Sequence, residues 1–89
     1  MFKIILKRSA EKSLKNLDKR VAKRIDNAFQ DFKDYPVPVE KYDIKKVADR
    51  KHTYRLRISK YRVIYKVDWE NSEVNILKIE KKDEETYRL

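Results

Sequence analysis

Three arginines flank a short polar break in an alternating segment of the chain, and their spacing could build a binding site for an anion. Arg55 and Arg57 precede residues 59–60, and Arg62 follows them. If residues 59–60 form a two-residue hairpin turn, Arg57 lies directly opposite Arg62, with Arg55, Lys66 and Ile64 on the same face. A longer loop with a bulge is the alternative and would shift some of these partners. Like charges placed opposite each other destabilise a sheet, so folding alone does not favour this pair. Arginine offers planar, multidentate hydrogen bonds to phosphate, which makes phosphate the expected ligand.

The same arginines could instead be held by acidic side chains of the protein itself. Glu80 and the acidic run at residues 83–85 are the candidates in the sequence. Such internal ion pairs would leave fewer cations for a ligand. Both interpretations stay open at this point, although the position of Arg57 opposite Arg62 favours a phosphate-facing site.

The basic character of the chain is concentrated in two blocks. The 89 residues include 24 Lys or Arg and 15 Asp or Glu, for a net charge of +9. Residues 1–24 contain nine bases and two acids, and residues 49–66 contain seven bases and one acid. A surface kept basic only for solubility or thermal stability would spread its charge more evenly. The clustering therefore favours a polyanionic partner.

The composition excludes several kinds of site. The chain has no Cys, which rules out a disulfide framework, a Cys-based zinc site and a thiol nucleophile. It has no Gly, which rules out a Walker-type phosphate loop and a GxGxxG dinucleotide turn. The single His, His52, cannot form a multi-His metal site. Apolar runs such as residues 4–6 are too short for a transmembrane helix or a signal peptide, so we expect a cytoplasmic protein with no membrane partner.

Two amphipathic helices are predicted in the first half of the chain, after a short apolar strand at residues 2–6. Apolar residues then recur at three- and four-residue spacing, which is typical of one buried helical stripe. Ser9 is a plausible N-cap for the first helix, and Asp18 interrupts the stripe where it could cap a second one. Pro36 and Pro38 end the helical region. We therefore expect a helical hairpin.

Strands are predicted in the second half of the chain, where the hydrophobic period changes to two. Residues 54–58 and 61–67 alternate apolar and polar side chains around the two-residue break, which is typical of an antiparallel hairpin. A further strand follows at residues 74–79, and the segment around Ile44 either forms a short strand or crosses the helices. This order predicts a single α+β domain, residues 1–89. An N-terminal strand and a helical hairpin would pack on an antiparallel sheet, followed by a short C-terminal helix or tail.

The hairpin segment resembles a known protein family. Residues 54–65, with the sequence YRLRISKYRVIY, are similar to the core motif of the RelE/ParE superfamily of toxins from type II toxin–antitoxin systems. Residues 12–19 resemble the family's first helix and its turn, residues 74–79 its last strand, and residues 81–88 its C-terminal ending. The resemblance spans nearly the whole chain and implies a RelE-like α+β fold.

The resemblance implies a ribosome-dependent mRNA endonuclease of the RelE type. Such toxins enter the ribosomal A site and cleave mRNA by attack of a ribose 2′-OH, with no metal and no other cofactor. The products are a 2′,3′-cyclic phosphate and a 5′-OH. The catalytic positions that the resemblance implies in this sequence are Arg55, Arg57, Arg62, Lys82 and Tyr87. The further residues expected to contact RNA are Lys60, Lys66, Lys81 and Arg88.

The resemblance also implies two partners, a cognate RelB-like antitoxin and the ribosome with mRNA in its A site. Two alternative functions stay open: inhibition of gyrase, as in the ParE branch, and binding of RNA or the ribosome without cleavage. The chain departs from the family pattern at three positions. Lys60 and Glu80 stand where the family commonly has Gly, and Lys82 stands where it usually has Arg.

Overall fold

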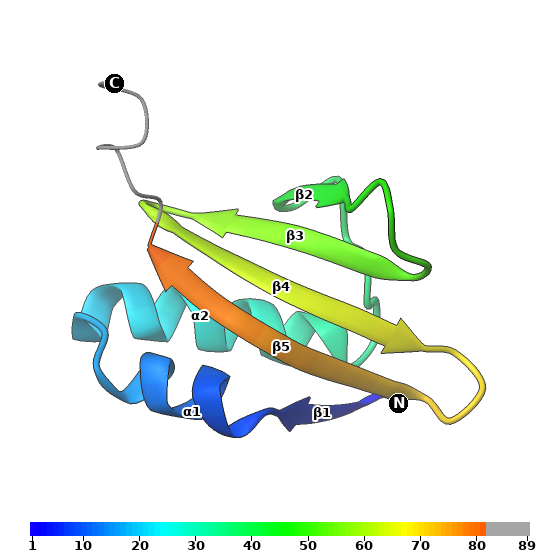
Figure 1. The fold of residues 1–89 in the computed structure, drawn as a ribbon, viewed down its shortest axis with the longest axis horizontal. Helices are drawn as coiled ribbons and strands as arrows, with labels where there is room; N and C mark the ends of the chain where they lie inside the picture. Colours follow the sequence, from blue (N-terminus) through cyan, green and yellow to red (C-terminus); the bar gives the residue numbers. More distant parts are fainter. Residues whose placement is uncertain (82–89) are drawn as a thin grey trace.

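The computed structural model describes residues 1–81, which form two helices packed on one face of a five-stranded sheet (Figure 1). In chain order the elements are β1 (Lys3–Leu6), α1 (Arg8–Lys15), α2 (Lys19–Phe32), β2 (Asp43–Lys46), β3 (Thr53–Ile58), β4 (Tyr61–Asp68) and β5 (Glu73–Lys81). The predicted α+β class and helical hairpin are confirmed. Within residues 1–81, neither helix is long and apolar enough to cross a membrane.

The strands lie in the order β1-β5-β4-β3-β2. The pairs from β2 to β5 are antiparallel, as expected, whereas β1 joins the edge of the sheet in parallel with β5. The sequence pattern could not indicate this direction, because side chains alternate between the two faces in both kinds of ladder. β1 and β2 form the opposite edges of the sheet. The two helices connect these strands across one face of the sheet (Figure 1).

The two helices begin in different ways. Asp18 caps α2 as predicted, because its Oδ1 accepts a hydrogen bond from the Arg20 N–H at 2.8 Å. The expectation for Ser9 is wrong, since α1 begins at Arg8 and Ser9 lies within its first turn. Lys7 takes the N-cap position without a side-chain hydrogen bond, and its N–H donates to the Ile76 carbonyl at 3.0 Å. The helix therefore starts directly where the chain leaves the sheet.

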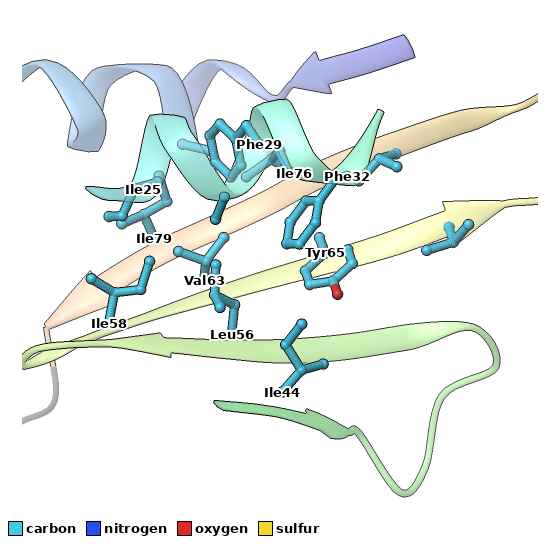
Figure 2. Packing of buried hydrophobic residues seen from close by; sticks show 14 residues of the cluster. Ile25, Phe29, Phe32, Ile44, Leu56, Ile58, Val63, Tyr65, Ile76 and Ile79 are labelled. Carbon is cyan, nitrogen blue, oxygen red and sulfur yellow. The ribbon is translucent and has the colours of Figure 1, made fainter. Parts of the chain in front are cut away.

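One hydrophobic core lies between α2 and the sheet (Figure 2). Its members labelled there are Ile25, Phe29 and Phe32 of α2, with Ile44, Leu56, Ile58, Val63, Tyr65, Ile76 and Ile79 of the sheet. The rings of Phe32 and Tyr65 stack with their centroids 4.5 Å apart. The buried Tyr65 hydroxyl donates a hydrogen bond to the Pro36 carbonyl at 2.8 Å. This bond ties the loop after α2 to the sheet, and α2 ends before Pro36 and Pro38 as predicted.

The β3–β4 hairpin has the predicted register. Arg57 pairs with Arg62 across a two-residue turn formed by Ser59 and Lys60. Ser59 has a φ of 55°, in the left-handed region that glycine usually occupies in hairpin turns. Of the two alternatives for the segment around Ile44, the strand is correct, because β2 pairs antiparallel with β3.

Candidate functional site

The outer face of the sheet, defined as the face turned away from α1 and α2, carries the three predicted arginines. In β3, Leu56 and Ile58 point toward α2 and are buried (Figure 2). Arg55 and Arg57 alternate with them and therefore point outward. Arg62 lies directly opposite Arg57, and paired residues share a face. The fold thus brings together three residues that the sequence predicted to act together.

Acidic side chains hold two of the three arginines. Arg55 Nη2 lies 3.3 Å from Asp43 Oδ1, and Arg62 Nη2 lies 3.4 Å from Glu80 Oε1. The alternative of internal ion pairing is therefore correct for Arg62 and Glu80, and it extends to Arg55 through an acid of β2 that the sequence did not indicate. Arg57 is exposed and forms no ion pair with residues 1–81. It is the arginine of this cluster that is most available to an anion.

The two paired arginines are packed against the sheet and do not extend fully into solvent. Their side chains are 27% exposed for Arg55 and 37% exposed for Arg62. The Nε of each is buried and has no hydrogen-bond partner within residues 1–81. A buried donor without an acceptor costs about 1–3 kcal/mol of folding free energy. Uncompensated groups of this kind are uncommon in folded proteins and are often found at functional sites.

Two further cations, Lys45 and Lys78, lie on the outer face, and the sequence analysis missed both. Lys45 pairs with Arg55 across β2 and β3, and Lys78 Nζ lies 3.2 Å from Glu80 Oε2. Alternation around the buried Ile44 was a usable signal for Lys45. No such signal existed for Lys78, because a bulge in the β4–β5 ladder breaks the period-two pattern of β5.

The other predicted site residues are distributed around this cluster. Lys66 is on the outer face but lies toward the far end of β4, opposite Thr53. Lys60 is exposed in the hairpin turn beside the arginines. Lys81 pairs with Tyr61, which puts it on the helix side of the sheet and apart from the arginines. The remaining predicted residues, Lys82, Tyr87 and Arg88, lie outside the described residues.

The outer face offers fixed positive charge and planar N–H donors. Arginine stays protonated at neutral pH, so this cluster can bind a phosphate or stabilise developing negative charge. It cannot supply a general base, which needs a group that titrates near the working pH. Within residues 1–81, no three His, Asp or Glu side chains come close enough together to hold a metal ion.

Asp31 of α2 fixes the segment that leads into β2. The Tyr42 hydroxyl donates a hydrogen bond to Asp31 Oδ2 at 2.5 Å, and Lys41 Nζ lies 2.9 Å from the same oxygen. Lys41 and then Tyr42 hold the pKa of the Asp31 carboxyl below its usual value. Burial, followed by the bond to Asp31, raises the pKa of Tyr42 to about 12. Since Asp43 follows directly, this cluster positions the acid that faces Arg55.

The chain belongs to the family of ParE toxins of type II toxin–antitoxin systems (parDE), which matches residues 4–86. It is 33% identical over 82 residues to a protein named toxin RelE1 from Methanocaldococcus jannaschii, covering 92% of this chain and 91% of that protein. The resemblance to the RelE/ParE superfamily is therefore confirmed.

Solved structures of RelE proteins have the same fold. The RelE–RelB complex from the archaeon Pyrococcus horikoshii OT3 matches with a TM-score of 0.84 and 29% identity, covering 93% of this chain and 97% of that chain. The isolated RelE toxin of E. coli matches with a TM-score of 0.81 over 99% of this chain and 93% of that chain. At 20% identity, this second likeness concerns the fold alone.

Proposed function

We propose that this protein is an endoribonuclease toxin that cleaves mRNA on the ribosome and thereby inhibits translation. The observation that carries the proposal is the position of Arg57 directly opposite Arg62 on the outer face, with Arg55 two residues along β3 on the same face. Acids of the protein flank this pair in the same row of the sheet, since Asp43 lies opposite Arg57 and Glu80 lies opposite Arg62. Arg57 nevertheless is exposed and forms no ion pair with residues 1–81, so it offers its guanidinium to an anionic ligand. The 33% identity to a protein named RelE supports activity of the RelE type.

In the proposed reaction, a ribose 2′-OH of the mRNA attacks the adjacent phosphorus while the bond from phosphorus to the 5′-oxygen breaks. The products are a 2′,3′-cyclic phosphate and a 5′-OH, and the reaction needs no metal. Arg55, Arg57 and Arg62 stabilise the additional negative charge of the phosphorane. Because arginine is a poor proton donor and acceptor at neutral pH, the cluster acts mainly by positioning and charge stabilisation.

Lys82 and Tyr87 complete the proposed site from beyond the described residues. A lysine titrates more readily than an arginine when it is desolvated, so Lys82 would protonate the leaving 5′-oxygen or remove the 2′ proton. Tyr87 would stack on a base or hold the 2′-OH in line. Lys60, Lys66 and Arg88 would contact phosphates that flank the cleaved bond.

Two partners follow from this proposal. The first is a RelB-type antitoxin, because the similar archaeal RelE was solved in complex with RelB. An acidic antitoxin segment near the outer face would neutralise or displace the arginines and block RNA. The second partner is a ribosome carrying mRNA in its A site, which puts the proposed activity in the cytoplasm.

Primer extension on mRNA in a purified translation system tests the proposal. The wild-type protein should produce new 5′ ends in register with codons. A folded Arg62→Ala variant should lose these cuts, because the phosphorane loses a cationic donor. Arg8→Ala, which removes an arginine at the start of α1, is the control and should cut normally. Ribosome-bound mRNA left intact by the wild-type protein would contradict the proposal.

The family match, described as ParE, favours gyrase inhibition as a second candidate function. A supercoiling assay with purified gyrase separates the two, because inhibited supercoiling with unaffected translation would support the ParE activity. A non-catalytic RNA-binding module would instead bind ribosomes in a salt-sensitive way and generate no new 5′-OH ends.

A further inference from the structure

A hollow of about 340 Å³ opens at the edge of the sheet between α2, the start of β2 and the end of β3. Arg24 and Asn27 line it from α2, Lys41 from the segment before β2, and Arg57 from β3. Within residues 1–81, β2 pairs with β3 only as far as Arg57, so Ile58 has no neighbouring strand on this side. The hollow therefore lies where the outer face turns around the sheet edge toward α2.

The side chains around the hollow carry an excess of positive charge. Arg24 and Arg57 form no ion pair with residues 1–81. Lys41 contacts Asp31, but its side chain remains 66% exposed and can reach a ligand. Asp43, the acid on the wall, is already engaged in an ion pair on the outer face. Cations from three separate segments thus converge on one concave site, which concentrates positive potential there.

We propose that this hollow binds a phosphate of single-stranded RNA next to the phosphate held between Arg57 and Arg62. The inference rests on the proposed nuclease function and adds a second anchoring point for its substrate. Arg57 connects the two positions, because it lies on the outer face and also lines the hollow. The strand would therefore leave the outer face across the β2–β3 edge and pass Arg24 and Asn27 of α2. Arginine, lysine and asparagine are all common donors to phosphate and sugar oxygens.

The composition of the hollow favours RNA over an acidic protein segment. A protein segment that orders on binding needs apolar anchors that fill pockets. Ile58 on this wall is 3% exposed and offers almost no surface to such an anchor. The ring of Tyr42 also lines the hollow, but Lys41 Nζ lies over it, 5.8 Å from its centroid, and its hydroxyl is bound to Asp31. Phosphate contacts require only the exposed donors that the hollow provides.

Fluorescence anisotropy with a labelled single-stranded RNA tests the inference, using 2′-O-methyl nucleotides so that the probe cannot be cleaved. Arg24→Gln and Lys41→Gln should each weaken binding about three- to fivefold, as expected for one exposed charge contact. Each should also make the slope of log affinity against log salt shallower by about 0.7, the value for one phosphate of a single strand. Arg8→Gln removes the same charge beside the opposite, β1 edge of the sheet and should change neither quantity.

Three outcomes would overturn the inference. If Arg62→Ala weakens binding while Arg24→Gln and Lys41→Gln do not, RNA uses the outer face alone, and the proposed function stands without the hollow. If the wild-type protein binds no RNA probe, the inference is wrong. The nuclease activity is then tested separately by primer extension on ribosome-bound mRNA. If Arg24→Gln weakens binding of polyglutamate and not of RNA, the hollow is a site for an acidic protein segment.

Discussion

Arg57 and Arg62 differ in their surroundings, and this difference determines how each can serve a ligand. The guanidinium of Arg62 forms an ion pair with the carboxylate of Glu80, whereas Arg57 is exposed and forms no ion pair with residues 1–81. A phosphate that reaches the outer face can bind Arg57 directly but must compete with Glu80 for Arg62. Because Glu80 also holds Lys78 at 3.2 Å, one acid restrains two cations. Glu80 therefore weakens the site to which it belongs.

Glu80→Gln is expected to tighten binding of single-stranded RNA by about two- to fivefold. A partly exposed ion pair of this kind contributes up to about 1 kcal/mol, which sets the size of the gain when Arg62 is released. Fluorescence anisotropy with the uncleavable RNA probe measures the effect. Glu73→Gln, which removes the same charge from the other end of β5, is the matched control. Unchanged or weaker binding by Glu80→Gln would show that Glu80 does not compete with the ligand.

The loops around the hairpins reach left-handed backbone conformations without glycine. The chain contains no Gly, yet His52, Ser59 and Ser72 have φ values of 54°, 55° and 54°. Glycine adopts this region readily, whereas a side chain with a Cβ crowds the following carbonyl there. His52 and Ser72 immediately precede β3 and β5, and Ser59 joins β3 to β4. The pairing of the strands is therefore strong enough to impose these conformations on unfavourable residues.

Ser72→Gly is expected to raise the free energy of unfolding by about 0.5–1 kcal/mol, because it removes this steric cost. For a domain of this size, the midpoint of thermal unfolding would rise by about 2–8 °C. Ser9→Gly is the matched control, since it makes the same substitution inside α1 and should destabilise by about 0.5–1 kcal/mol. A lower melting temperature for Ser72→Gly would contradict the account of the loops.

The contact of Asp31 with Tyr42 predicts how stability depends on pH. The pKa of Asp31 is lower in the folded state, so its contribution is present above the usual value of 3.8 and is lost as pH falls through the folded-state pKa. The pKa of Tyr42 is raised from 10.0 to about 12, so its contribution is present below pH 10 and is lost as pH rises through about 12. The cluster is therefore most stabilising between these limits.

Thermal unfolding of wild type and Tyr42→Phe across this pH range checks the prediction. The variant should have a lower free energy of unfolding near neutral pH. It should also lose less stability than the wild type as pH rises from 10 to about 12, because it lacks the Tyr42 hydroxyl. Tyr35→Phe is the control, because Tyr35 is 73% exposed. Parallel pH profiles for wild type and Tyr42→Phe would contradict the assigned role of the hydrogen bond to Asp31.

The sequence predicted the hairpin well and the partners of its arginines only in part. The register followed from alternation on both sides of a two-residue break, which leaves one arrangement with every apolar side chain except Ile64 on one face. Asp43 was not predicted because it lies 12 residues before Arg55, and only the pairing of β2 with β3 brings them together. The misplaced cap at Ser9 has a similar cause, since the local signal could not show that β1 runs directly into α1.

At the scale of the whole molecule, the two basic blocks of the sequence lie on different sides of the fold. Residues 1–24 form the edge strand β1 and, behind the sheet, α1 and the first part of α2, whereas residues 49–66 supply the arginines of the outer face (Figure 1). Arg24, the last residue of the first block, is the member of that block that lines the hollow beside Arg57. Solvation of an exposed helix surface is the simpler role for the other bases of the first block.

The most direct test of the central claim is the rate at which Arg57→Gln cleaves mRNA bound in the ribosomal A site under single-turnover conditions. Because Arg57 is exposed and unpaired within residues 1–81, the substitution should change the free energy of unfolding by less than about 0.5 kcal/mol. Loss of one donor to the transition state should slow cleavage by about 10²–10³-fold, while Arg8→Gln keeps the wild-type rate. A folded Arg57→Gln protein that cleaves at the wild-type rate would contradict the claim that the outer-face arginines form the RNA-cleaving site.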